Sequence, residues 1–194
     1  MVYTDMRKLI VTENITLDGV IEATGGWFDP VGNDGVDQSD QVEFMSNHML
    51  AADAFLVGRV TFEQMRGFWP KQTEDTTGVS DYLNRVSKYV VSSTMHDPDW
   101  VNSTVLSGDL DEEIRELKSQ PGGDIVTTGS ITLVHALVAA GLVDQYRLFV
   151  YPVVLGSGAR LFAEATSVPG LQLGQAQPFR SGIVALTYQV LDPS

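Results

Sequence analysis

The sequence predicts an α/β protein with a mostly parallel mixed sheet, flanking helices and an antiparallel hairpin at the C-terminal end. Short β-branched runs alternate with segments of helical spacing from residue 9 to residue 140, as in strand–helix–strand units. Residues 171–179 and 183–191 have the pattern of two strands joined through Arg180-Ser181-Gly182. No repeat, low-complexity tract or linker interrupts the chain. We therefore expect one domain over residues 1–194.

The expected elements follow in chain order. A strand at residues 9–11 precedes a long loop at residues 13–35, and its Trp27-Phe28 pair is typical of a lid or binding loop. The helix expected at residues 36–52 carries an apolar stripe that should lie in the core, formed by Val42, Met45, Met49 and Ala52. Further strands are expected at residues 54–57, 89–91, 101–106, 124–126 and 146–151, and further helices at residues 61–68, 109–118 and 131–140.

Two of these segments have a distinctive composition. Residues 131–140 are almost wholly apolar and end at Gly141, so this helix should be buried on all sides. Residues 69–84 are polar and contain a proline, and we assign no helix or strand to them.

Composition excludes several classes of function. Twelve Lys and Arg against 25 Asp and Glu give a formal charge of −13, which would repel a nucleic-acid backbone. The chain has no cysteine, so disulfides, thiol nucleophiles and Cys-ligated metals are excluded. His48, His96 and His135 lack metal-ligand spacing, and we expect no metal site. The N-terminal apolar run is too short for a signal peptide or membrane span, so we expect a cytoplasmic protein with no membrane partner.

Two strand-to-helix junctions are candidates for anion binding, because helix N-termini present unpaired amides and a partial positive charge. The first is Gly58-Arg59-Val60-Thr61, where a guanidinium suited to phosphate follows the glycine, and the second is Gly129-Ser130. A third expected strand ends in Ser92-Ser93-Thr94. Together they predict a ligand with several phosphates along the carboxyl edge of the sheet. Gly156-Ser157-Gly158 lacks the rest of a dinucleotide fingerprint.

These residues also carry a resemblance to a known family. The motifs, in order, are Thr16-Leu17-Asp18-Gly19, Gly58-Arg59-Val60-Thr61-Phe62-Glu63, Val91-Ser92-Ser93, Thr128-Gly129-Ser130, Gly141-Leu142-Val143-Asp144, and Pro152-Val153-Val154-Leu155-Gly156-Ser157-Gly158 followed by Leu161-Phe162. From about residue 6 to residue 191 the chain resembles the dihydrofolate-reductase-like family. Within it, the chain is similar to the reductase (C-terminal) domain of the bifunctional riboflavin-biosynthesis deaminase-reductase and its stand-alone relatives.

The resemblance implies a three-layer fold with NADPH at the carboxyl edge of the sheet and hydride transfer to a small pyrimidine-type or pterin-type substrate. It places Gly58, Arg59 and Thr61 at the adenosine-side phosphates, Ser92 and Ser93 near the 2′-phosphate, Gly129 and Ser130 at the pyrophosphate, and Asp18 and Gly19 near the nicotinamide. It also implies a homodimer, which the terminal hairpin and the strand at residues 146–151 could build.

The catalytic residues implied by the resemblance are Asp40, Asp18 and Trp27. Trp27 falls in the loop that covers the site, and Asp40 is placed like the substrate-binding carboxylate. Asp37 is one helical turn away and is an alternative to Asp40. Either carboxylate, desolvated under the loop, would orient the substrate and raise its basicity, with a water delivering the proton.

The chain also departs from the family pattern. Thr128 stands where dihydrofolate reductases have the first of two glycines, and no zinc-deaminase signature is present. NADPH and NADH both stay open, since Arg59 is the one obvious cation near the expected 2′-phosphate. The alternative function is a non-catalytic module that binds a nucleotide or a flavin on the same fold.

Overall fold

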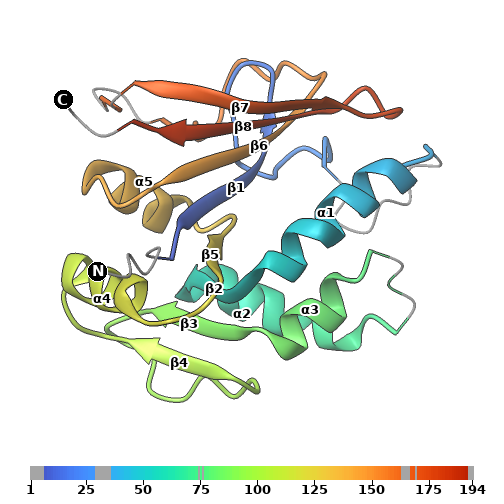
Figure 1. Cartoon of the computed structure of the whole chain (residues 1–194). Helices are drawn as coiled ribbons and strands as arrows, with labels where there is room; N and C mark the ends of the chain where they lie inside the picture. Colours follow the sequence, from blue (N-terminus) through green and yellow to red (C-terminus); the bar gives the residue numbers. More distant parts are fainter. Residues whose placement is uncertain are drawn as a thin grey trace.

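One eight-stranded sheet organises the chain (Figure 1). The computed structural model describes residues 7–28, 36–73, 75, 77–162, 167–168 and 170–191. The strands are Leu9–Thr16 (β1), Ala52–Gly58 (β2), Ser87–Val91 (β3), Ser103–Leu106 (β4), Asp124–Thr127 (β5), Gln145–Tyr151 (β6), Leu171–Pro178 (β7) and Val184–Val190 (β8). Their order is β4-β3-β2-β5-β1-β6-β8-β7, parallel up to β6 and antiparallel in the last two pairs. The fold class predicted from the sequence is confirmed.

Helices cover both faces of the sheet. They are Ser39–Ala51 (α1), Arg59–Phe68 (α2), Val79–Arg85 (α3), Leu110–Ser119 (α4) and Ile131–Ala139 (α5), with a short 3-10 helix at Trp69–Lys71 (η1). In Figure 1, α4 and α5 lie on one side of the strands and α1 and α3 on the other. None of the helices in the described part of the chain is long and apolar enough to cross a membrane.

Separate apolar clusters fill the two faces. On the α4 and α5 face, Leu9, Val11, Leu56 and Ile125 of the sheet join a cluster with residues such as Leu137. On the other face one cluster joins β2 and β3 to α2 and α3, and a second packs β6 and β8 against the hairpin turn and α1. Burial of these side chains is the main favourable term in folding.

The order of the strands places a crevice at the carboxyl edge. From β1 the chain moves through β2 and β3 to the β4 edge, and from there it returns through β5 to β6. Strand β1 pairs with β5 only over residues 9–11, whereas its pairing with β6 continues to Thr16. Beyond Val11 the sheet is therefore open on the β5 side of β1. In α/β sheets, ligands bind where the chain direction reverses in this way.

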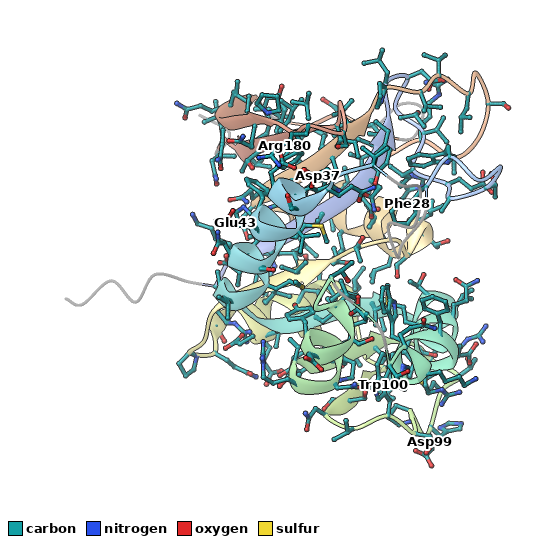
Figure 2. The ribbon with its side chains drawn as sticks, turned by 90° about the vertical axis from the view of Figure 1, so that its right-hand side faces the viewer. Phe28, Asp37, Glu43, Asp99, Trp100 and Arg180 are labelled. Carbon is teal, nitrogen blue, oxygen red and sulfur yellow. The ribbon has the colours of Figure 1, made fainter. Side chains whose placement is uncertain are left out.

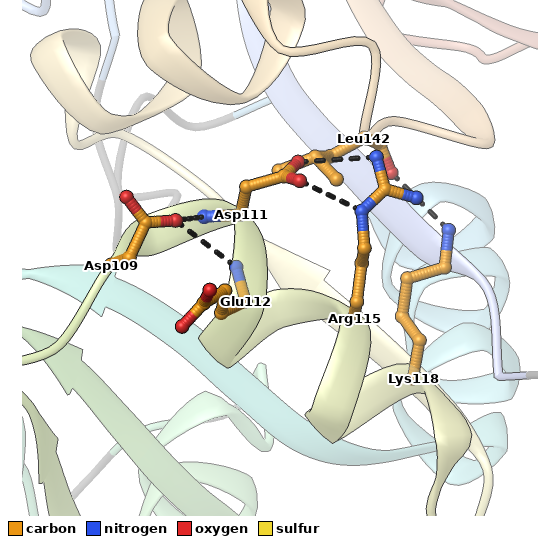
Figure 3. A network of polar contacts seen from close by, with 6 residues as sticks. All are labelled: Asp109, Asp111, Glu112, Arg115, Lys118 and Leu142. Carbon is orange, nitrogen blue, oxygen red and sulfur yellow. Dashed lines mark hydrogen bonds and ion pairs between the residues drawn. The ribbon is translucent and has the colours of Figure 1, made fainter.

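Charged residues of opposite sign stabilise the two ends of α4 (Figure 3). Asp109 caps α4 by accepting hydrogen bonds from the N–H groups of Asp111 (3.0 Å) and Glu112 (3.2 Å). At the other end of the helix Lys118 donates to the Leu142 carbonyl (3.3 Å) and pairs with Asp144 (2.6 Å). Acidic groups early and a cation late both stabilise a helix through its dipole.

The predictions for one strand and one helix were wrong. Strand β1 continues to Thr16, because residues 12–16 gain hydrogen-bond partners on β6 although Thr12, Glu13 and Asn14 interrupt the apolar run. Helix α3 occupies part of the segment to which no element was assigned. Its turns are held by tertiary packing of Tyr82 and Leu83 in the α2–α3 cluster, which local polarity does not indicate.

Two burial predictions are confirmed only in part. In the stripe expected at residues 36–52, Ala52 is buried and Met45 and Met49 pack against the core clusters, but Val42, Met45 and Met49 are only partly buried because they also line a cavity. Helix α5 is buried on one face only, and Ala139 is exposed. His135, on the same helix, is partly exposed, and its Nε2 lies 2.7 Å from the Arg160 carbonyl oxygen.

Candidate cofactor and substrate site

A cavity of about 310 Å³ lies beside the carboxyl ends of the central strands. Its wall on the sheet includes Thr12 and Asn14 of β1 and Phe149 and Tyr151 of β6. The partly buried stripe of α1 forms the opposite wall, and the remainder comes from the loop after β1, from α2, η1 and α3, and from Thr128 and Gly129 after β5. Such a concave and mainly apolar site with a few polar groups is the usual form of a small-molecule site.

Trp27 and Phe28, in the loop after β1, line part of this cavity, and a catalytic role for Trp27 stays a prediction. The Trp27 ring meets Tyr151 edge-on at 5.2 Å between centroids, and Phe28 meets the same ring at 6.0 Å. Trp27 Nε1–H donates to the Glu22 carbonyl oxygen (3.0 Å), which fixes the indole. Figure 2 shows Phe28 on the same side of the molecule as α1. These three rings give a flat ligand apolar surfaces to pack against.

The two predicted anion-binding junctions are joined to each other. The Gly58 N–H donates to Ser130 Oγ (3.0 Å), and the Ser130 N–H donates to Thr61 Oγ1 (3.0 Å). A Cβ at Gly129, where φ is +62°, would lie 3.2 Å from Thr61 Cγ2. The N-termini of α2 and α5 therefore form one unit built from four of the predicted cofactor residues. Gly129 is also part of the cavity lining.

The remaining predicted phosphate ligands lie at the neighbouring strand ends. Register pairs Gly58 with Val91, so Arg59 and Ser92 follow at the same edge of the sheet. Arg59 is half-exposed and forms an ion pair with Glu63 (2.9 Å). Ser92 Oγ accepts from the N–H groups of Thr94 (3.2 Å) and Met95 (3.0 Å), which closes a turn. Ser93 is exposed.

Asp18 and Gly19 are outside the cavity lining. The Asp18 carboxylate accepts from Thr16 Oγ1 (2.7 Å) and from the Gly156 (2.8 Å) and Leu155 (3.3 Å) N–H groups. These bonds, with that from Thr16 first, lower the pKa of Asp18 to about 2. Gly19 follows with φ +88°. Asp18 thus fastens the end of β1 to the glycine-rich loop after β6, and its catalytic role stays a prediction.

Asp40 and Asp37 also lie outside the lining, since both hold the hairpin turn. Asp40 accepts from the Arg180 N–H (3.0 Å) with one oxygen and from the Gln41 N–H (3.0 Å) with the other. Arg180 Nη1 donates to Asp37 (2.7 Å), and Figure 2 shows the two side chains together beside α1. Hydrogen bonds from Ser39, followed by the one from Arg180, lower the pKa of Asp37 to about 2. Substrate binding by either carboxylate stays a prediction.

The carboxylate that does line the cavity is Glu13, which the sequence analysis did not select. Its side chain is 3% exposed, and Oε2 accepts from the Gly129 N–H (3.1 Å). Oε1 has no hydrogen-bond partner among the described residues. Burial raises the pKa of Glu13 well above its usual value. The signal was the alternation Leu9, Val11, Glu13, Ile15, which puts a carboxylate at an inward position once the strand is extended to Thr16.

Comparisons with known proteins agree with this geometry. A pyrimidine reductase-like protein from Corynebacterium diphtheriae NCTC superposes with a TM-score of 0.65 at 16% identity, over 96% of this chain and 93% of that chain. Dihydrofolate reductase from Enterococcus faecalis, solved with NADP(H), superposes with a TM-score of 0.61 at 17% identity, over 95% and 97%. Both likenesses show the fold, and they confirm that it is dihydrofolate-reductase-like.

Sequence comparison assigns the family. The uncharacterized protein YyaP of Bacillus subtilis (strain 168) is 31% identical over 188 residues, with 94% of each chain covered. The family model described as RibD C-terminal domain matches residues 7–185, nearly the whole chain. The predicted resemblance is thereby confirmed, and this chain belongs to the RibD C-terminal domain family.

Proposed function

We propose that this protein is an NADPH-dependent reductase that transfers a hydride to a small heterocyclic substrate of the pyrimidine or pterin type. The observation that carries the proposal is the meeting of two parts of the site at Gly129. The joined N-termini of α2 and α5 reach the cavity there, and its N–H is held by the buried Glu13. Membership of the RibD C-terminal domain family and the fold shared with a dihydrofolate reductase solved with NADP(H) support the proposal.

The residues present fit a phosphate-bearing nucleotide. Gly58 and Gly129 stand at the two junctions, and the two helix N-termini favour negative charge. Thr61 and Ser130 fix these junctions through their mutual hydrogen bond, and Arg59 supplies a cation at the edge. We assign pyrophosphate binding to the Gly129-Ser130 junction and the adenosine-side phosphates to the Gly58 junction. NADPH, when bound, supplies the hydride.

Glu13 takes the role of the carboxyl group that faces the substrate, in place of Asp40. Burial raises the pKa of Glu13, so its side chain keeps a proton to a higher pH than a fully solvated carboxylate does. Its unpartnered Oε1 is available to a ring nitrogen or carbonyl of the substrate. Trp27, Phe28 and Tyr151 pack against the flat ring and exclude water.

Thermal unfolding with NADPH, NADH or no nucleotide tests cofactor binding. A nucleotide at about a hundred times its Kd adds about 2.7 kcal/mol, which raises the Tm by about 5–10 °C for a chain of this size. We expect this rise with NADPH. The absence of a shift with both nucleotides would overturn the reductase proposal.

Steady-state kinetics then test the carboxylate. With dihydrofolate as the first probe of a pterin-type substrate, oxidation of NADPH is followed by its absorbance. Glu13→Gln should lower kcat by about 10²–10⁴-fold, as expected for loss of a general acid, and leave the NADPH-induced rise in Tm intact. Loss of turnover in Asp40→Asn together with an unaffected Glu13→Gln would return the role to Asp40. Cofactor binding without turnover of any pyrimidine or pterin probe would favour the non-catalytic module.

A further inference from the structure

A smaller pocket of about 70 Å³ adjoins the cavity beneath α1. It shares Thr12, Met45 and Tyr82 with the cavity lining and adds His48 and Arg147 to the wall. A guanidinium group that the proposed reaction does not use therefore lies in the wall of a pocket next to the cavity.

Arg147 is buried, and no residue in the described part of the chain forms a hydrogen bond with its guanidinium. Arg147 as a whole is 5% exposed, and its Nε has no hydrogen-bond partner among the described residues. The same part of the structure contains no hydrogen bond or salt bridge from any atom of this guanidinium. Arginine is almost never fully buried unless it is paired, because an uncompensated charge is costly in a low-dielectric interior.

The strands on either side of Arg147 add further unpartnered polar atoms. Register places Thr12 of β1 and Thr187 of β8 directly opposite Arg147. Both hydroxyl oxygens are buried and without a hydrogen-bond partner in the described structure. Because strand neighbours in register share a face of the sheet, these three polar groups form one row across three strands.

Such atoms gather at this cavity. The described residues contain eight buried side-chain polar atoms without a partner, and five of them belong to Thr12, Glu13, Gln41, Tyr82 and Arg147, which line the cavity or its inner pocket. Buried polar groups are nearly always satisfied, so each exception requires an explanation such as a bound ligand or water. Their concentration at one cavity indicates a polar ligand.

None of the titratable groups near Arg147 forms a hydrogen bond with it in the described structure, so its guanidinium can still pair with an anion. Asp124 and Tyr82 are close enough for their charges to affect its pKa, and neither makes a hydrogen bond to it. On the facing helix, burial first and the charge of Arg147 second lower the pKa of His48 to about 4, so its imidazole is neutral at neutral pH. The wall of the inner pocket is mainly apolar, and it includes one cation and one neutral imidazole.

We propose that the inner pocket binds a carboxylate group of the substrate, paired with Arg147. The planar guanidinium matches a carboxylate in shape and charge. This inference rests on the proposed function and narrows its substrate to a flat ring bearing a carboxylate.

Binding of benzoate and benzamide to the purified protein without nucleotide tests the inference. The two probes share a ring and differ in charge. By calorimetry, benzoate should bind about tenfold more tightly than benzamide, as expected for a charge-assisted pair. Benzoate should also raise the pKa of His48, followed by NMR of its imidazole, because it places a negative charge beside the ring. Equal affinities with an unchanged His48 titration would overturn the proposal.

Two variants locate the effect. Arg147→Met removes the buried charge and should abolish the preference for benzoate, whereas Arg115→Met, on the exposed face of α4 (Figure 3), should keep it. A preference that survives in Arg147→Met would overturn the assignment, as would tighter binding of inorganic phosphate than of benzoate. If Arg147→Met does not fold, the affinities of the wild type for benzoate and benzamide, together with the His48 titration, still test the proposal. The benzoate comparison is made without nucleotide, so it does not depend on cofactor binding. If NADPH gives no rise in Tm but benzoate still binds more tightly than benzamide, the reductase proposal is refuted and the carboxylate site is not.

Discussion

Replacement of Gly129 by alanine tests the joined helix N-termini most directly. At φ +62° an L side chain is strained, which costs about 1–2 kcal/mol. The new Cβ would also lie 3.2 Å from Thr61 Cγ2, and a shift of Thr61 would disturb its hydrogen bond from the Ser130 N–H. Overpacking of this kind costs about 1 kcal/mol or more in addition.

Gly141→Ala is the matched control. Gly141 follows α5 with φ +65°, and a Cβ there would meet nothing within 4 Å. It should show the strain alone, a fall in Tm of about 2–8 °C for a chain of this size. Gly129→Ala should show a further fall of about 2–4 °C per additional kcal/mol.

Differential scanning calorimetry of both variants, with and without NADPH, separates stability from cofactor binding. Gly141→Ala should retain the full NADPH-induced rise in Tm, and Gly129→Ala should lose most of it, because a shift of Thr61 and of its hydrogen bond from the Ser130 N–H displaces the junction that we assign to the pyrophosphate. Equal falls in Tm for the two variants would show that Thr61 moves aside without a loss of stability. A full NADPH response in Gly129→Ala would refute the assignment of this junction to the cofactor.

Three further predictions concern charge and assembly. Burial raises the pKa of Glu13 above its unfolded value of 4.5, so the folded state binds more protons than the unfolded state above that pH, and stability falls as pH rises through this range. The Tm of Glu13→Gln relative to wild type should therefore increase from about pH 5 to about pH 8, and a constant difference would contradict the raised pKa. Arg59→Ala should weaken NADPH by about tenfold or more in fluorescence titration and leave NADH nearly unchanged, if this cation binds the 2′-phosphate; equal losses would place it elsewhere. If the hairpin builds the expected homodimer, Leu173→Lys on the exposed β7 should yield monomers in sedimentation velocity, whereas a monomeric wild type would remove that expectation.

Local sequence signals were sufficient for most of the fold. Apolar runs that end in glycine, such as the one before Gly58, carry their own strand-to-helix boundary. The second half of β1 was missed because its hydrogen bonds come from β6, more than a hundred residues later. Helix α3 was missed for a related reason, since Tyr82 and Leu83 are buried by elements that its own sequence does not specify.

The site predictions also differ according to whether they depend on local sequence or on contacts between distant segments. Gly58, Thr61, Gly129 and Ser130 could be selected because the chemistry of a helix N-terminus is local, and the structure joins them. The position of Asp40 depends on Arg180, which the hairpin brings from 140 residues away. The spacing of residues within α1 does not show that Asp40 contacts Arg180. Burial of Glu13 likewise depends on where β5 ends, which only the register of the sheet determines.

Two buried ionisable side chains of the site, Glu13 and Arg147, lie on opposite faces of the sheet. Register pairs Arg147 with Thr12, the residue before Glu13 on β1. Because successive side chains of a strand alternate between its faces, Glu13 and Arg147 project to opposite sides and cannot form an ion pair with each other. Mutual neutralisation would remove the cost of burying both groups and would leave neither available to a ligand. Their separation instead leaves a carboxyl group of raised pKa next to Gly129 and a cation in the wall of the inner pocket. A substrate that satisfies both must be polar at two places and flat between them, which sets the orientation in which it can bind.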